Sequence, residues 1–219
     1  MKRLIQFVTF VIMIIVVAGC NTSKGESQKA TADMKIPDTI AYKDDFTRKY
    51  LNSKKEVIKG FYRFNSMTKG YTMQFPVNAK VSQEELALNS DVFESFRFNE
   101  VDRKENLVYD YKITYENRPI TSNVDLNLAL LSRDVGYEGN YEQFDHEEKT
   151  YYYAKIVKKD KKIITYRYFS YIKSSQSDKA ISYVMSFAED DSSENRKPKP
   201  EKLEEKFLNM IKSIDFSEQ

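Results

Sequence analysis

The chain contains a single cysteine, a single histidine and no tryptophan. Because Cys20 is the only cysteine, no internal disulfide can form, and the fold has to be stabilised by burial of apolar side chains. A zinc-protease helix needs two histidines four residues apart, and position 150 after His146 is threonine, so that class of metal hydrolase is excluded. No Gly-x-Ser-x-Gly turn accompanies His146 either. We therefore interpret the acidic stretch around His146 as an exposed loop.

An excess of charge of one sign is also missing. The sequence has 35 Lys and Arg against 33 Asp and Glu, and two of the basic residues, Lys2 and Arg3, lie in an N-terminal segment without acids. A protein that binds nucleic acid normally shows a basic excess or a clustered basic face. We expect no nucleic-acid partner.

What the chain does have is aromatic residues, 16 Tyr and 14 Phe among 219 residues. Aromatic side chains pack well on the pleated surface of a sheet, which makes an all-helical fold the weaker hypothesis. The length suits one domain with a full core. We expect a single globular α+β domain over residues 39–219.

Residues 1–19 have the features of a signal peptide. Lys2 and Arg3 precede a nearly unbroken apolar run over residues 4–18. As a helix this run would span about 22 Å, short of the roughly 30 Å hydrocarbon core of a bilayer. A permanent transmembrane anchor is therefore the weaker interpretation.

The segment Val17-Ala18-Gly19-Cys20 resembles the lipobox of bacterial lipoproteins, an aliphatic residue and two small residues before a cysteine. The resemblance implies that the Cys20 thiol receives a diacylglyceryl group, that cleavage follows Gly19, and that Cys20 can then be N-acylated. Two acyl chains would hold the protein in the lipid bilayer of the cell membrane, on its extracytoplasmic face, without a span. An ordinary secretory signal that ends in cysteine, or an uncleaved anchor, is the alternative.

The stretch that follows Cys20 has almost no bulky apolar residue as far as residue 38. Such a composition predicts a flexible tether, with a root-mean-square reach of roughly 25 Å for about 20 residues. Residues 38–59 are ambiguous, because their apolar residues are irregularly spaced, and we expect them to be weakly helical.

Alternating apolar residues predict strands from residue 61 onward. One strand ends at Pro76, and a hairpin is expected from strands around residues 96–98 and 109–115 with a polar turn at 104–106. Three further strands are expected over residues 150–158, 161–174 and 179–188. The strand over 161–174 has apolar residues on both faces, which is typical of a central strand covered on both sides.

Two helices are predicted. Ser122 or Asn123 can cap a helix over residues 124–135 that Gly136 ends. The second, over residues 201–213, has one apolar stripe centred on Phe207, and we expect it to lie on the sheet. The neighbouring Lys206 is expected to contribute little to stability.

The stretch Lys69-Gly70-Tyr71-Thr72-Met73-Gln74-Phe75-Pro76 is similar to the opening of the PsbP/Mog1 family as it occurs in small bacterial lipoproteins. The strand over 181–187, the helix over 203–211 and a short strand at 214–216 extend the resemblance. It implies an antiparallel β-sheet flanked by helices, a PsbP/Mog1-like α/β/α sandwich with an amphipathic C-terminal helix. It also implies a binding or assembly-accessory role without shared catalytic residues.

Two further groups of residues are candidate sites. The segment Asp190-Asp191-Ser192-Ser193-Glu194-Asn195 offers oxygen ligands but lacks the spacing of an EF-hand, so a solvated loop is favoured. A set of tyrosines in the predicted strands could form a stacking surface, but core packing is the more common role. These tyrosines are Tyr151, Tyr152, Tyr153, Tyr166, Tyr168 and Tyr171.

These features favour a lipid-anchored, non-enzymatic module that binds another cell-envelope protein or polymer, or assists its assembly. We expect no catalytic residue, cofactor or metal. One alternative is a surface hydrolase that uses paired carboxylates such as Asp145 and Glu147, and another is a lipoprotein that captures a small ligand. Carboxylates that converge on a cavity would favour the hydrolase.

Overall fold

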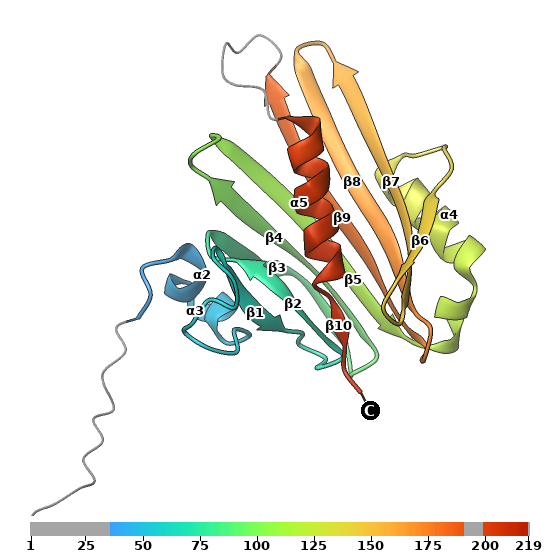
Figure 1. Cartoon of the computed structure of the whole chain (residues 1–219), viewed down its shortest axis with the longest axis horizontal. Helices are drawn as coiled ribbons and strands as arrows, with labels where there is room; N and C mark the ends of the chain where they lie inside the picture. The colour runs from blue at the N-terminus through green and yellow to red at the C-terminus, as the bar shows by residue number, and fades with distance from the viewer. Residues whose placement is uncertain (1–35, 191–198, 219) are drawn as a thin grey trace, which may run out of the picture. The chain divides into compact units, whose positions relative to one another are not determined.

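The computed structural model describes residues 36–190 and 199–218, and its elements are drawn in Figure 1. The predicted signal peptide, the lipobox and nearly all of the tether lie outside the described residues. In chain order the elements are α2 (Ile40–Lys43), α3 (Asp45–Arg48), β1 (Phe61–Asn65), β2 (Tyr71–Pro76), β3 (Ala79–Asn89), β4 (Phe93–Asp102), β5 (Leu107–Asn117), η1 (Pro119–Ser122), α4 (Val124–Val135), β6 (Glu142–His146), β7 (Lys149–Asp160), β8 (Ile163–Ser174), β9 (Lys179–Asp190), α5 (Pro200–Lys212) and β10 (Asp215–Phe216).

The described strands form two antiparallel sheets. The large sheet has seven strands in the order β3-β4-β5-β9-β8-β7-β6. Strands β3, β4 and β5 form one antiparallel meander, and β6, β7 and β8 form another. β9 pairs with both β5 and β8 and so joins the two meanders into one sheet. The small sheet has the order β1-β2-β10, in which the short β10 adds to the first hairpin.

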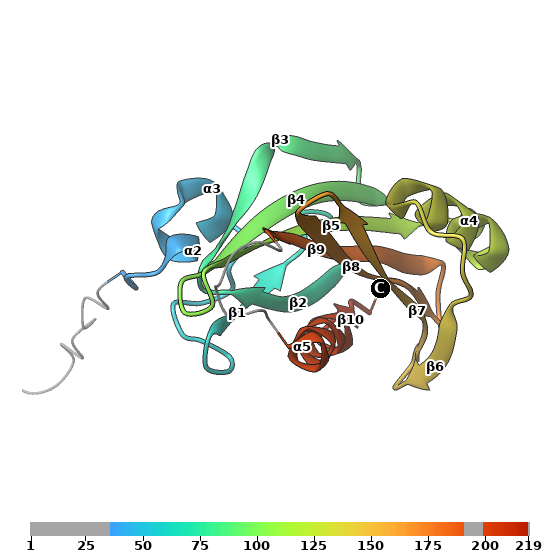
Figure 2. The same cartoon turned by 90° about the horizontal axis from the view of Figure 1, so that it is seen from above.

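The two faces of the large sheet have different covers (Figure 2). Because side chains alternate along a strand, each strand supplies one set to each face. The face under α5 and the small sheet buries the larger core, where Phe207 of α5 lies 5.7 Å from the ring of Tyr153 and 5.8 Å from that of Tyr183. On the opposite face Leu131 and Val135 of α4 pack against Phe169 and its neighbours.

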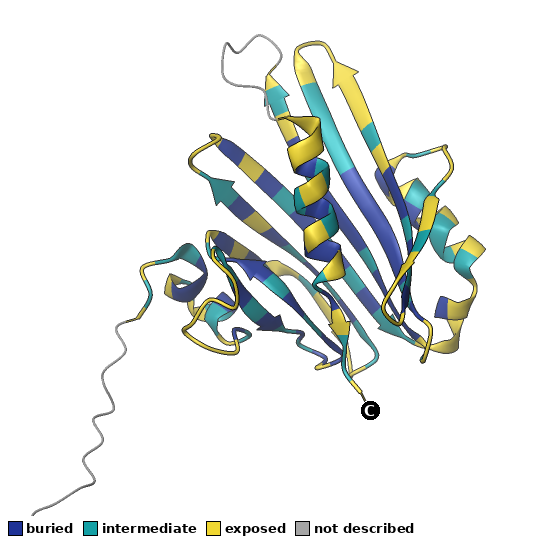
Figure 3. Ribbon diagram, in the orientation of Figure 1, coloured by how far each residue is buried: buried dark blue, intermediate teal, exposed yellow. Residues whose placement is uncertain are grey.

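These layers confirm the predicted α+β class, an antiparallel sheet flanked by helices. β8 pairs with β9 and β7 and is therefore internal, as predicted. Figure 3 shows its second half as almost continuously buried, in contrast to the alternation along β4 and β5. The small sheet shares the α5 face, and the sequence analysis did not foresee that layer.

Both predicted helices are present. α4 spans Val124–Val135 as expected, because the Asn123 side chain accepts a hydrogen bond from the Leu126 N–H and Gly136 ends the helix with a φ of 68°. The four buried residues of α5 form its predicted stripe. They are Leu203, Phe207, Met210 and Ile211.

Residues 38–59 were expected to be weakly helical, and they contain two four-residue helices followed by a loop, with Asp44 ending one helix and capping the next. Two strands, by contrast, were not predicted. β3 was missed because its second half is mostly exposed and lacks alternation. β6 was missed because Phe144 is its one partly buried residue, and His146 therefore lies in an edge strand and not in a loop.

No helix within residues 36–190 or 199–218 is both long enough and apolar enough to cross a bilayer.

Candidate functional site

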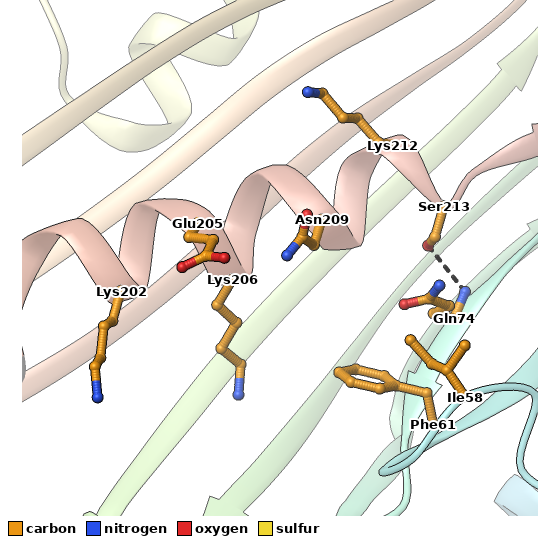
Figure 4. Close-up of a pocket in the computed structure, with 9 residues that line it drawn as sticks. All are labelled: Ile58, Phe61, Gln74, Lys202, Glu205, Lys206, Asn209, Lys212 and Ser213. Atoms are coloured by element: carbon orange, nitrogen blue, oxygen red, sulfur yellow. Dashed lines mark hydrogen bonds between the residues drawn. The ribbon is translucent and has the colours of Figure 1, made fainter.

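A groove of about 610 Å³ runs between α5 and the hairpin of β1 and β2 (Figure 4). Its lining is mixed, with aliphatic and aromatic groups at one side and polar groups along the helix. The lining residues are Ile58, Phe61, Gln74, Lys202, Glu205, Lys206, Asn209, Lys212 and Ser213.

The helix contributes the flank next to its buried stripe. Lys202, Lys206, Asn209 and Ser213 follow one another at intervals of three or four residues, so they lie on one side of the helix. At 1.5 Å per residue, this flank is about 16 Å long. Ser213 closes one end, because its Oγ accepts a hydrogen bond of 3.0 Å from the backbone N–H of Gln74.

The hairpin contributes the apolar wall. Phe61 begins β1, and Ile58 pairs with it through an isolated bridge. Ile58 is 50% exposed. The groove therefore offers apolar contact at one side that the fold itself does not cover.

Lys206 is part of the fold and is not available to a ligand. Its ammonium lies 2.7 Å from Oε1 of Glu100 and 4.2 Å from the centre of the Tyr109 ring. Glu100 is buried, and its other oxygen accepts a hydrogen bond of 2.7 Å from the Tyr111 hydroxyl. Burial, with Glu100 as the next cause, raises the pKa of Tyr111 well above its usual range, so this hydroxyl stays protonated and donates.

The remaining helix residues define what the groove can contact. Lys212 points to the opposite side of α5 in Figure 4, where its ammonium lies 5.6 Å from the centre of the Phe144 ring. Lys202, Glu205 and Asn209 stay exposed along the opening. A cation, a carboxylate and an amide beside an apolar wall suit the binding of a chain that has both polar and apolar groups.

The carboxylates that the sequence suggested for a hydrolase, Asp145 and Glu147, have different partners. Asp145 accepts a hydrogen bond of 2.7 Å from the Thr150 hydroxyl. Glu147, in the turn after β6, instead lies 2.9 Å from the ammonium of Lys149, which is also 3.6 Å from Asp215 of β10. This ammonium donates a further hydrogen bond of 2.6 Å to the backbone oxygen of Ile214.

Glu147, Lys149 and Asp215 border a cavity of about 260 Å³. Lys149 is buried, and its hydrogen bond and charge lower the pKa of Glu147, so Glu147 stays ionised at neutral pH. A general acid needs a raised pKa, and the arrangement instead ties β10 to the turn between β6 and β7. The pairing of Lys149 with Asp215 could not be predicted, because nothing in the sequence relates positions so far apart.

The tyrosines belong to the core, as the sequence analysis favoured. Tyr151, Tyr153, Tyr168 and Tyr171 are buried. Tyr152 and Tyr166 are partly buried and pack against the two cores.

Of the segment 190–195, Asp190 alone lies within the described residues. The described part of the chain contains no cluster of three or more His, Cys, Asp or Glu placed to hold a metal ion.

Comparisons with known proteins agree on one family. A family model described as "Putative lipoprotein YvcA" matches residues 37–215. The chain is 28% identical over 238 residues to "Putative lipoprotein YvcA" of Bacillus subtilis (strain 168), and the alignment covers 99% of this chain and 97% of that protein.

Among solved structures, one from Bacteroides thetaiotaomicron VPI-5482 matches with a TM-score of 0.44 and 12% identity. The match covers 74% of this chain and 50% of the other, so this chain spans half of that protein.

Proposed function

This chain belongs to the lipoprotein family described as "Putative lipoprotein YvcA", and from that premise we propose that it is an extracytoplasmic, lipid-anchored module that binds another envelope component without catalysis. The anchor is Cys20, which follows the short apolar run and the small residues Ala18 and Gly19. Two acyl chains on one residue suffice for stable attachment to a bilayer.

The observation that carries the binding role is the groove along α5. It is open, about 16 Å long by helix geometry and bordered by the exposed side chain of Ile58. Its polar groups include the amides of Gln74 and Asn209, which can each donate and accept hydrogen bonds. An extended segment of a partner protein presents both backbone amides and apolar side chains, and it matches this lining better than a compact charged ligand does.

Site-specific photocross-linking in intact cells tests the proposal. A photoreactive residue in place of Asn209 should form discrete adducts with one envelope component. The same residue in place of Leu126, which is 40% exposed on α4, is the matched control on the other face of the sheet. The adducts from position 209 should be lost when Phe61→Asp places a charge in the apolar wall.

Two outcomes would contradict the proposal. Identical adducts from positions 209 and 126 would show collision without a site. Adducts that persist in the Phe61→Asp variant, when its circular dichroism matches the parent, would place the contact outside the groove.

A further inference from the structure

The loop over residues 53–60, between α3 and β1, places apolar side chains among lysines on the surface. Val57 is 45% exposed and Ile58 is 50% exposed, and Lys54, Lys55 and Lys59 flank them. The loop has an ordered backbone, because the Val57 N–H donates to the backbone oxygen of Phe61 at 2.9 Å. Its single acid, Glu56, accepts a hydrogen bond of 2.7 Å from the Gly60 N–H. Fixed aliphatic side chains among cations are typical of a surface that contacts anionic lipid.

This loop lies beside the point where the N-terminal segment joins the domain. The N–H of Ala41 in α2 donates to the backbone oxygen of Val77 at 3.0 Å, and the N–H of Val77 donates to that of Gly60 at 2.9 Å. Thr39 in turn contacts Tyr62 through their hydroxyl groups at 3.2 Å. The first described residues and the end of the loop are therefore neighbours in space.

The acids around this junction are already paired. Asp38 pairs with Lys43, Asp44 with Lys80 and Asp45 with Arg48. Lys55 and Lys59 form no ion pair within the part of the chain that the structure describes. The loop over residues 53–60, with three lysines and Glu56 as its one acid, has a formal positive charge.

We propose that loop 53–60 contacts the anionic headgroups of the bilayer that carries the anchor, with Val57 and Ile58 at the interface. The inference rests on the proposed anchor at Cys20, which is 16 residues before residue 36. If the intervening residues form the flexible tether that their composition predicts, their root-mean-square reach would be roughly 22 Å, and the loop would stay close to the lipid. Because Ile58 also lines the groove, the groove then opens at the membrane surface.

The tip of the β7–β8 hairpin serves as a control. Like loop 53–60 it has an exposed valine among lysines, but acidic residues lie beside it. Val157 is 57% exposed there, and Lys158, Lys161 and Lys162 lie around it. The strand pairing places acids beside this tip, with Glu189 opposite Ile164 and Asp190 opposite Ile163. Lys158 is also engaged, since its ammonium donates to the backbone oxygen of Gly136 at 2.8 Å.

The experiment uses the processed chain, residues 20–219, with Cys20→Ser so that no acyl chain contributes. Cosedimentation with vesicles of phosphatidylglycerol and phosphatidylethanolamine should show binding that weakens with salt and is lost on phosphatidylcholine vesicles. Replacing Lys54, Lys55 and Lys59 by Glu should lower the partition coefficient at least about tenfold, because each lysine near an anionic surface contributes roughly fivefold. The matched triple replacement of Lys158, Lys161 and Lys162 should change it less than about threefold.

A second readout follows insertion itself. The Cys20→Ser chain has no other cysteine, so a polarity-sensitive fluorophore can be attached at Val57→Cys or at the control Val157→Cys. On anionic vesicles the emission at position 57 should shift to the blue, and that at position 157 should not.

Equal effects of the two triple variants, or a shift at position 157 alone, would overturn the proposal. Binding to soluble polyphosphate as tight as to vesicles, without a shift at position 57, would show a general polyanion contact and would also overturn it. Because these measurements use an unacylated chain, they are independent of whether Cys20 carries lipid.

Discussion

Gly70 is required by a close contact of its backbone with the ring of Tyr115. A Cβ atom added at position 70 would lie 2.2 Å from the Tyr115 hydroxyl oxygen and 2.3 Å from Cζ. Tyr115 is buried and also packs on Tyr71, with ring centroids 5.3 Å apart. The glycine in the family-like stretch at residues 69–76 therefore has a steric cause, which the sequence pattern alone did not reveal.

We predict that Gly70→Ala lowers the free energy of unfolding by about 1–3 kcal/mol, the usual cost of overpacking a well-packed core. Urea denaturation followed by circular dichroism measures this loss. Glu138→Ala, at an exposed position, is the control and should change the free energy of unfolding by less than about 0.5 kcal/mol. Equal and small shifts of the two midpoints would show that Tyr115 moves aside at little cost.

At the scale of elements, α5 buries one stripe of side chains in the core and presents one flank to the groove. Its neighbouring residues Lys206 and Phe207 have different contacts, because Lys206 pairs with Glu100 and Phe207 packs in the core. Phe207 is fully buried among Tyr153, Tyr168 and Tyr183. From the sequence, Lys206 is expected to contribute little to stability, whereas in the structure its ammonium lies 2.7 Å from the buried carboxylate of Glu100.

We predict that Phe207→Ala costs about 3–5 kcal/mol of folding free energy, through lost burial and the cavity that remains. Lys206→Ala should also destabilise the fold, by about 1–3 kcal/mol, because it leaves Glu100 buried without its cation. Glu205→Ala, one residue away and exposed, should cost less than about 0.5 kcal/mol. Urea midpoints compare the three, and a Lys206→Ala midpoint equal to that of Glu205→Ala would contradict this account of the ion pair.

The elements that could be predicted from the sequence are those with a clear apolar period. α4 and α5 followed from the spacing of their apolar residues, and the family match over residues 37–215 confirms the resemblance based on the hairpin and the C-terminal helix. β6 has the sequence EQFDH, in which one partly buried phenylalanine gives no period. The groove had no signal either, because Phe61 and Asn209 meet only when the chain folds, and Asn209 alone resembles any solvent-facing residue.

At the scale of the whole molecule, the proposed anchor at Cys20 and the proposed lipid contact of the loop over residues 53–60 would have complementary roles. Residues 36–190 and 199–218 contain no helix that could cross a bilayer. Cys20 is the one cysteine, and it directly follows Val17, Ala18 and Gly19. The loop over residues 53–60 would then orient a domain that lipid already holds nearby, and weak surface contacts suffice for that task.

We predict that Cys20→Ser abolishes acylation, because the resemblance to a lipobox makes this thiol the expected acceptor of the diacylglyceryl group. Cells given labelled palmitate should incorporate the label into the parent chain and not into the variant, which should accumulate as precursor or be released. Adding Ser23→Cys to the Cys20→Ser chain is the control: it restores a thiol three residues later but without the preceding small residues. Because lipobox processing depends on the residues before the cysteine, this double variant should stay unlabelled. Label in the Cys20→Ser chain would refute the anchor, and label restored by the displaced thiol would point to ordinary thiol acylation in place of lipobox processing.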